Sequence, residues 1–345
     1  NPKYLVDTGL CFKVDKDEPG NKSGQDKYLD RFSGRAIFPW LSVSGKVVAF
    51  GGRVLDSRTK GVNQKYVNSP DSEIYHKERE LYGLYQAKKA IAKEDCVYMV
   101  EGYTDVISMH QCGIENVVAN SGTALSIHQI RLLHRFTSNI VLLYDGDAAG
   151  VHAALRGTDM LLEQEMNVKV LFLPNGNDPD SFARNHTATD FKKYIEDNMS
   201  DFIQFKTEVL LKGVTDPVKR SQAINSIVES ISKIKNQITR ASYITDCAHR
   251  LGVNEAIIVN ALNNFIRNGM SEQVKAERRV AGLQTPQANA SLQGVQSGLR
   301  GTTPLDKLLE VESLLVQLII HHGEKSWYRM WMETTWNCLW RNISV

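Results

Sequence analysis

The sequence predicts an α/β fold (α+β overall), in which a parallel β-sheet with helices on both faces joins a mixed N-terminal part and a C-terminal helical part. Three observations predict this class. Apolar runs of strand length alternate with helical patterns from residue 94 to 186, as in parallel sheets. Short β-like runs and Ser, Gly and Asp turns dominate before residue 94. From Thr187 to Asn268 the pattern is helical throughout.

The N-terminal part contains three β-like runs, "AIFPW", "KVVAFGG" and "KYVNSP", and then a predicted helix from about Lys77 to Ala92. In the alternating part, Val97 to Val100 are too few for a helix but suit a buried strand, and Gly113 ends the helix that follows. The same reasoning predicts strands at 96–100, 116–120, 139–145 and 168–174, with helices at 104–112, 126–136 and 149–164.

Beyond Asn268, residues 270–303 contain few large apolar groups and are predicted to form a flexible linker. The amphipathic pattern "PLDKLLEVESLLVQLIIHHG" then predicts a helix that begins another, incomplete domain. The expected divisions are therefore 1–93, 94–186, 187–269, 270–303 and 304–345. Because the sequence starts with Asn1 and not Met, we expect a piece of a longer protein.

Composition narrows the class of protein. The 345 residues are 42% hydrophobic, which supports sizeable cores, and no apolar run reaches the about 18 residues that span a bilayer. We therefore expect a cytoplasmic protein with no membrane partner. The five cysteines lie far apart without a CxxC pair, which argues against a zinc ribbon and against a disulfide framework.

Charge is segregated along the chain although the net charge is only +2. Residues 31–93 hold twelve Lys and Arg against five Asp and Glu, whereas residues 94–180 hold four against twelve. Basic surface suits a polyanion, and clustered acids suit a divalent cation. The pattern favours a protein that handles nucleic acid or nucleotides through a metal, although two solvated faces of opposite charge would explain it equally well.

Acidic residues follow three of the predicted strands. Glu101 ends the first, Asp145 and Asp147 end the third in "YDGD", and Asp178 and Asp180 follow the fourth in "NDPDSF". Because the carboxyl ends of parallel strands share one sheet edge, we expect these carboxylates to lie close together. Their oxygens suit Mg²⁺ or Mn²⁺ better than zinc. Each motif alone has a simpler interpretation as a turn or a helix cap.

These motifs resemble a known family. "VEGYTDV", "YDGDAAG" and "DPD" resemble the Toprim domain of primases, some topoisomerases and some nucleases. Upstream, "RFSGRAIFPW", "GKVVAFGGRVL", "QKYVNSP" and "YHKERELYGLYQAKKAI" are similar to the N-terminal half of the RNA polymerase core in bacterial DnaG-type primases. The resemblance covers about Tyr4 to Asn268, so 94–186 would be the Toprim domain.

The resemblance implies template-directed synthesis of short RNA primers on single-stranded DNA from ribonucleoside triphosphates. It implies five metal-binding acids: Glu101, Asp145, Asp147, Asp178 and Asp180. The first three of these would also be catalytic, and Asp105 would support them. Lys65, Tyr66, Asn68 and Lys77 would bind the nucleotide, and Arg31, Arg35 and Arg53 the template. A replicative helicase would bind through the C-terminal region, incomplete here, and no zinc is expected in this fragment.

Two other functions stay open from the sequence. A Toprim nuclease or topoisomerase would share the acids, but a nuclease would not need the basic "KYVNSP" and "YHKERELYGLY" segments, and a topoisomerase needs another large domain. A non-catalytic DNA-binding module would not need the acids at three strand ends. Ser33 stands where the family often has a basic residue, and Phe38 and Trp40 are expected in the core rather than on bases.

Overall fold

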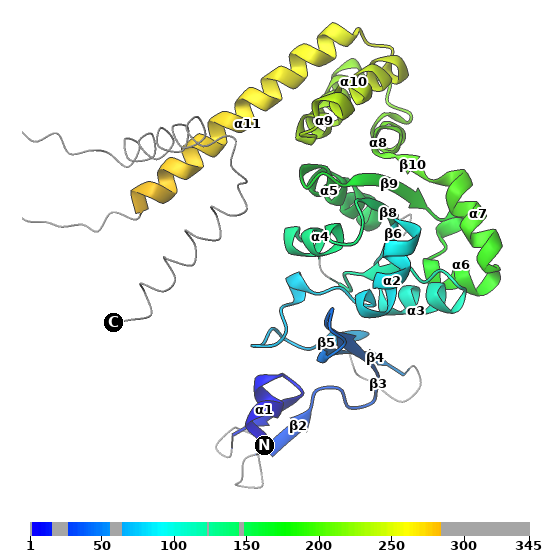
Figure 1. Ribbon diagram of the computed structural model, residues 1–345, viewed down its shortest axis with the longest axis vertical. Helices are drawn as coiled ribbons and strands as arrows, with labels where there is room; N and C mark the ends of the chain where they lie inside the picture. Colours follow the sequence, from blue (N-terminus) through cyan, green and yellow to red (C-terminus); the bar gives the residue numbers. More distant parts are fainter. Residues whose placement is uncertain (1, 16–26, 56–63, 123, 145–147, 284–345) are drawn as a thin grey trace, which may run out of the picture. The chain divides into compact units, whose positions relative to one another are not determined.

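The computed structural model describes residues 2–15, 27–55, 64–122, 124–144 and 148–283 (Figure 1). Residues up to Val280 form one compact unit, within which the expected boundaries at 93 and 186 stay predictions. In these ranges no helix is both long and apolar enough to cross a membrane.

The N-terminal part consists of a short helix and two small antiparallel sheets. Helix α1 (Pro2–Asp7) precedes the pair β1 (Cys11–Val14) and β2 (Lys27–Asp30), and a three-stranded sheet follows with β3 (Arg35–Leu41), β4 (Val47–Val54) and β5 (Tyr66–Asn68). The three β-like runs of the sequence are therefore strands. Trp40 is 1% exposed and packs edge-on against Tyr75, Tyr82 and Tyr103, which confirms its expected core position.

The central sheet has five strands in the order β10-β9-β8-β6-β7. Strands β6 (Val97–Val100), β7 (Val117–Ala119), β8 (Asn139–Tyr144) and β9 (Asn167–Phe172) are parallel, and β10 (Ser200–Asp201) is antiparallel to β9. The predicted parallel sheet is confirmed. A 3₁₀ turn, η2 (Pro174–Gly176), follows β9 directly.

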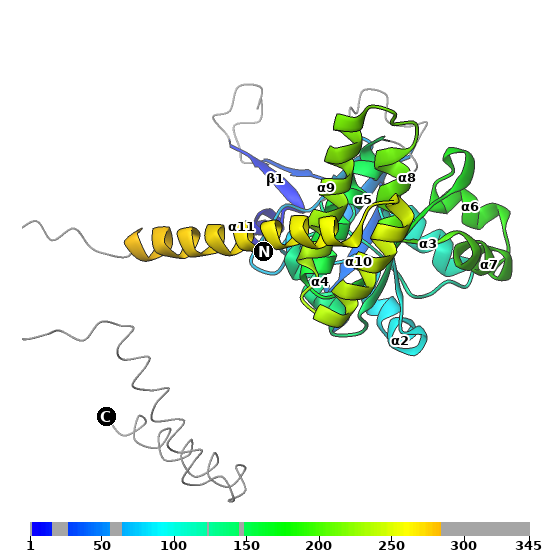
Figure 2. The ribbon, with the colours of Figure 1, turned by 90° about the horizontal axis from the view of Figure 1, so that it is seen from above.

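Helices cover both faces of this sheet because successive residues of a strand point to opposite sides. Leu142 and Tyr144 of β8 pack with α2 (Leu84–Glu94), α4 (Ile127–His134) and α5 (Ala148–Glu163). Val141 and Leu143 pack on the other side with α3 (Tyr103–Gln111), α6 (Pro179–Asn185) and α7 (Ala188–Asn198). Figure 2 shows α3, α6 and α7 together on one side of the sheet.

The helical part contains α8 (Phe202–Leu211), α9 (Pro217–Lys233), α10 (Gln237–Leu251) and α11 (Glu255–Leu283). Lys206 of α8 is 2% exposed and its Nζ donates to Asp159 Oδ1 of α5 over 2.8 Å, which joins the helical part to a helix that packs on the sheet. The structure differs from the predicted linker at 270–303, because α11 continues to Leu283. Residues 284–303 and the expected domain at 304–345 lie outside the described residues.

The predicted helix from Lys77 to Ala92 is a second difference. A 3₁₀ turn, η1 (Lys77–Arg79), comes first, and α2 begins only at Leu84. Between them, the backbone of Tyr82 exchanges two hydrogen bonds with Ala119 of β7, at 2.9 and 3.0 Å. Gly83 then turns the chain with φ of +85°, where a Cβ atom would lie 2.8 Å from Val106 Cγ1. Pairing with the sheet therefore replaces the first helical turns.

Candidate active site

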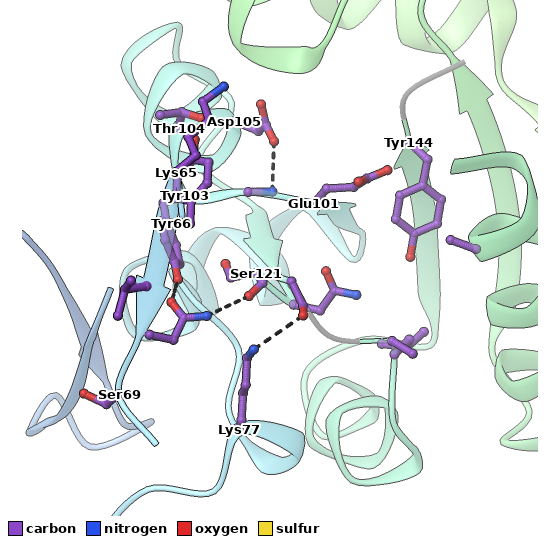
Figure 3. Close-up of a pocket in the computed structure, with 18 of the residues that line it drawn as sticks. Lys65, Tyr66, Ser69, Lys77, Glu101, Tyr103, Thr104, Asp105, Ser121 and Tyr144 are labelled. Carbon is purple, nitrogen blue, oxygen red and sulfur yellow. Dashed lines mark hydrogen bonds between the residues drawn. The ribbon is translucent and has the colours of Figure 1, made fainter. Parts of the chain in front are cut away.

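A cleft of about 1070 Å³ lies at the carboxyl ends of β6 and β7 (Figure 3). Four segments supply most of its described lining: residues 64–71 around β5, 101–105 between β6 and α3, residues 120–122 and 124–125 after β7, and one face of α5. The basic N-terminal part and the acidic sheet part thus meet in one cavity.

Glu101 and Asp105, from the segment between β6 and α3, line this cleft. Glu101 directly follows β6 and is half-buried. Asp105 is 8% exposed and its Oδ2 accepts the backbone N–H of Gly102 over 2.9 Å, so it also caps α3. Burial, with the charge of Glu101 nearby, raises the pKa of Tyr144 above its ordinary value.

The structure separates the two acids of the "DPD" motif. Asp178 lines the cleft and caps α6, with Oδ1 accepting Ser181 N–H over 2.7 Å. Burial would raise the pKa of Asp178, but hydrogen bonds from Ser181 and the charge of Arg184 outweigh it and lower this pKa. Asp180 is not in the cleft lining; it accepts hydrogen bonds from Ser108 Oγ and from Arg184 Nε, the latter over 2.8 Å.

Asp145 and Asp147 lie outside the described residues. Among the residues that the structure does describe, no three Asp, Glu, His or Cys side chains gather as a metal-binding group. The described acids of the cleft are oxygen donors, and its described lining includes no His or Cys. This donor set fits Mg²⁺ or Mn²⁺ rather than zinc.

All four residues expected to bind a nucleotide, Lys65, Tyr66, Asn68 and Lys77, line the same cleft. The Asn68 amide is fixed at both ends: its Oδ1 accepts from the Tyr103 hydroxyl and its Nδ2 donates to the Ser121 carbonyl over 3.2 Å. Lys77 Nζ lies 3.4 Å from the carbonyl oxygen of Gly122. Figure 3 shows Lys77 and Glu101 approaching the cavity from different elements.

The three arginines expected on the template path have different surroundings. Only Arg31 lines the cleft. Arg35 donates to the backbone carbonyls of Gln64 at 3.0 Å and Lys65 at 3.2 Å. The Arg53 guanidinium lies 5.6 Å from the centre of the Tyr66 ring. Arg35 and Arg53 therefore support the segment that carries Lys65 and Tyr66.

Sequence reasoning missed the loop after β7 and one cation. Asn120, Ser121 and Gly122 line the cleft, and Ser121 adopts φ of +47°, which is uncommon for a residue with a side chain. The rule that ligands lie beyond carboxyl strand ends applies to β7 as well, so "NSG" carried a usable signal. Arg156 of α5 also lines the cleft, and no local motif marks it.

Three family models match successive parts of the chain. Residues 16–88 match the N-terminal domain of the DNA primase catalytic core, 98–183 a Toprim-like domain, and 203–256 the DnaB-helicase binding domain of primase. A DNA primase domain from Pseudomonas aeruginosa is 31% identical with a TM-score of 0.65, over 76% of this chain and 79% of that one. The chain belongs to the bacterial DnaG-type DNA primase family.

Similarity to other primases supports this assignment. A DnaG primase catalytic domain solved with single-stranded DNA is 32% identical, with a TM-score of 0.63 over 74% of this chain and 77% of that one. The DNA primase of Clostridium acetobutylicum is 38% identical over 269 residues, which are 76% of this chain and 42% of that protein. The primase of Pasteurella multocida is 38% identical over 68% of this chain and 40% of that protein. The chain thus spans about two-fifths of these curated relatives.

Proposed function

We propose that this primase-family chain synthesises short RNA primers on single-stranded DNA from ribonucleoside triphosphates. One observation carries the proposal: Glu101, Asp105 and Asp178 line the same cleft as Lys65, Asn68 and Lys77. Nucleotidyl transfer needs such a pairing of acids and cations, because a polyanionic triphosphate must be held while charge develops at the α-phosphate.

In this proposal, Glu101, Asp145, Asp147 and Asp178 would hold Mg²⁺ or Mn²⁺. When bound, the ion would neutralise phosphate charge and stabilise the leaving pyrophosphate. Asp105 would support Glu101 by holding the turn at Gly102. The ion pair with Arg184 leaves Asp180 a weaker candidate ligand than the sequence suggested, and its role stays a prediction.

The cations and the amide would position the nucleotide. Lys65 and Lys77 would attract its phosphates, and Asn68, fixed by Tyr103 and Ser121, would offer a preorganised polar group. Glu101 would also be able to accept the proton of the attacking 3′ hydroxyl; this role is secondary to metal binding, because a carboxylate alone does not distinguish a base from a ligand. Arg31 would contact template phosphates at the cleft and give binding a salt dependence.

We also propose a replicative helicase as partner and the cytoplasm as location. The match of residues 203–256 to the helicase-binding model supports the partner, and it covers the segment from α8 to the start of α11. The sequence predicts the helicase-binding region at 304–345 instead; those residues lie outside the described ranges, and this stays a prediction.

A direct assay tests the catalytic proposal. The purified chain is incubated with single-stranded DNA, ribonucleotides and Mg²⁺ or Mn²⁺, and short RNA is the expected product. Glu101→Gln and Asp145→Asn should abolish synthesis with the fold intact. The exposed residues Glu115 and Asp197 supply matched controls, Glu115→Gln and Asp197→Asn, which should retain synthesis.

Three outcomes would contradict the proposal. Unchanged synthesis in Glu101→Gln and Asp145→Asn would remove the catalytic assignment. Cleaved template without RNA would favour a Toprim nuclease, and DNA binding without either product would favour a non-catalytic module.

A further inference from the structure

The pair of strands β1 and β2 has one face whose chemistry the proposed function does not use. Phe12 lies directly opposite Leu29, and Val14 opposite Lys27. Because cross-strand partners share a face, these four side chains lie together, while Lys13 and Tyr28 point to the other face. Phe12 and Leu29 are 47% and 45% exposed.

Arg31 extends this face beyond the end of β2. Its guanidinium carbon lies 4.0 Å from the centre of the Phe12 ring, a cation–π contact, and its Nε donates to the Gly9 carbonyl over 2.6 Å. Arg31 thus covers one side of the Phe12 ring, while Phe12 itself stays nearly half exposed. An aromatic ring and two cations, Lys27 and Arg31, occupy one surface.

This surface continues into the cleft. Arg31 lines both. In addition, the turn before β1 packs tightly on the cleft wall, because a Cβ atom on Gly9 would lie 2.2 Å from Cδ of Pro70, which itself lines the cleft. The Phe12 face and the cleft therefore adjoin at Arg31 and at the contact between Gly9 and Pro70.

We propose that the face formed by Phe12, Leu29, Lys27 and Arg31 binds single-stranded nucleic acid outside the cleft, with a base stacked on Phe12 and its phosphates on the two cations. This inference rests on the proposed function and extends it to a second contact surface for the template. Aromatic rings bind bases of any sequence in this way, and adjacent cations bind the backbone. The surface would bind without sequence preference.

The test measures binding of a fluorescent oligodeoxythymidine of about 15 nucleotides to the whole chain, together with the same oligonucleotide carrying abasic positions throughout. Phe12→Ala should weaken binding of the intact oligonucleotide about 5- to 150-fold, because stacking of one base contributes about 1–3 kcal/mol. Phe12→Trp should retain binding, which also separates loss of stacking from loss of fold.

The neighbouring Tyr28 provides the matched control. It is 43% exposed on the same strand pair but on the opposite face, so Tyr28→Ala should bind as tightly as the wild type. Phe12→Ala and the wild type should bind the abasic oligonucleotide with equal affinity. Arg31→Gln should reduce the salt dependence of binding, whereas Phe12→Ala should leave it unchanged.

The proposal is overturned if Phe12→Ala binds the intact oligonucleotide as tightly as the wild type does. It is also overturned if Tyr28→Ala loses as much affinity as Phe12→Ala, or if Phe12→Ala binds abasic DNA more weakly than the wild type does. These results leave primer synthesis by the wild type untouched. A wild type that binds no single-stranded DNA would instead contradict the proposed function itself.

Discussion

The hydroxyl of Tyr103 donates a hydrogen bond to the side-chain oxygen of Asn68. Tyr103 begins α3 and is 2% exposed, and Asn68 ends β5, so this bond joins the acidic sheet to the basic N-terminal part. The Tyr103 ring stacks on Phe38 at 5.2 Å between ring centres. The orientation of the Asn68 amide in the cleft is therefore set by the first residue of α3, the helix that follows β6.

Removing this hydroxyl should weaken nucleotide binding. Tyr103→Phe keeps the ring but leaves Asn68 Oδ1 without the donor, so we expect the KM for ribonucleotides to rise about fivefold, which corresponds to about 1 kcal/mol. Steady-state primer synthesis measures it, with kcat nearly unchanged. Tyr82→Phe serves as control, since Tyr82 packs 4.9 Å from Tyr103 in the same cluster. An unchanged KM in a folded Tyr103→Phe protein would exclude this positioning role.

A single added methyl group on β4 should disturb the same contact. At Gly51 a Cβ atom would lie 2.7 Å from Cζ of Tyr103, so Gly51→Ala should lower the free energy of unfolding by about 1–3 kcal/mol through overpacking. Urea denaturation measures this change. Gly269→Ala is the opposite control: nothing lies within 4 Å of its Cβ position in α11, and it should stabilise by up to about 1 kcal/mol.

The ion pair between Lys206 and Asp159 should respond unequally to loss of its two members. The Lys206 side chain is 2% exposed and that of Asp159 34% exposed, so Asp159→Asn leaves a buried ammonium with less compensation. We expect Asp159→Asn to cost about 3–5 kcal/mol of unfolding free energy and Lys206→Met less.

A double-mutant cycle completes this test. The double variant Lys206→Met, Asp159→Asn should cost less than the two single losses combined, because the interaction is lost only once. Ser230, whose Oγ donates to Asp159 over 2.6 Å, stays intact in all variants. Additive losses would show that the pair carries no coupling.

The stability contributed by Asp178 should depend on pH. Its folded-state pKa is lowered although partial desolvation of the carboxylate opposes this, because hydrogen bonds from Ser181 and the charge of Arg184 favour the charged form. The stabilisation is therefore present above the unfolded pKa of about 3.9 and is lost as pH falls through the folded pKa. Since Asp178 is exposed, the free energy of unfolding of the wild type should exceed that of Asp178→Asn by less than about 1 kcal/mol at pH 7.

Urea midpoints between pH 7 and 2 measure this difference, with Asp197→Asn as a control for removing an exposed charge. The gap between wild type and Asp178→Asn should close on acidification. A gap that widens as the pH falls would contradict the direction of the shift.

Local pattern was sufficient for the four parallel strands of the central sheet and for much of the cleft. It missed β10, whose two residues lie in the stretch predicted to be helical throughout and pair with β9 only in the folded chain. The alternation of apolar runs and helices predicted β6 to β9, and the strand-end rule brought Glu101 and Asp178 to one cavity. The rule was applied to acids alone, which is why Ser121 and its neighbours were missed. Asp180 could not be placed from sequence, because Ser108 and Arg184 compete for it only in the folded chain.

The two errors in helix boundaries have separate causes. Ahead of α2, the pairing of Tyr82 with Ala119 is a long-range contact that overrides local helical periodicity. At α11, the stretch after residue 269 was judged by its lack of large apolar groups, although its Glu, Gln, Lys, Arg and Ala residues favour a helix. Intrinsic helix propensity would have extended that prediction.

The bridge between Tyr82 and Ala119 also bears on solubility. Strand β7 lies at one margin of the five-stranded sheet, and the two-residue β10 lies at the other. Exposed strand margins invite pairing with a second molecule and so promote aggregation. Tyr82 occupies the N–H and C=O groups of Ala119, so neither margin offers a long unpaired stretch of backbone. This arrangement should help the protein to remain monodisperse when it is concentrated.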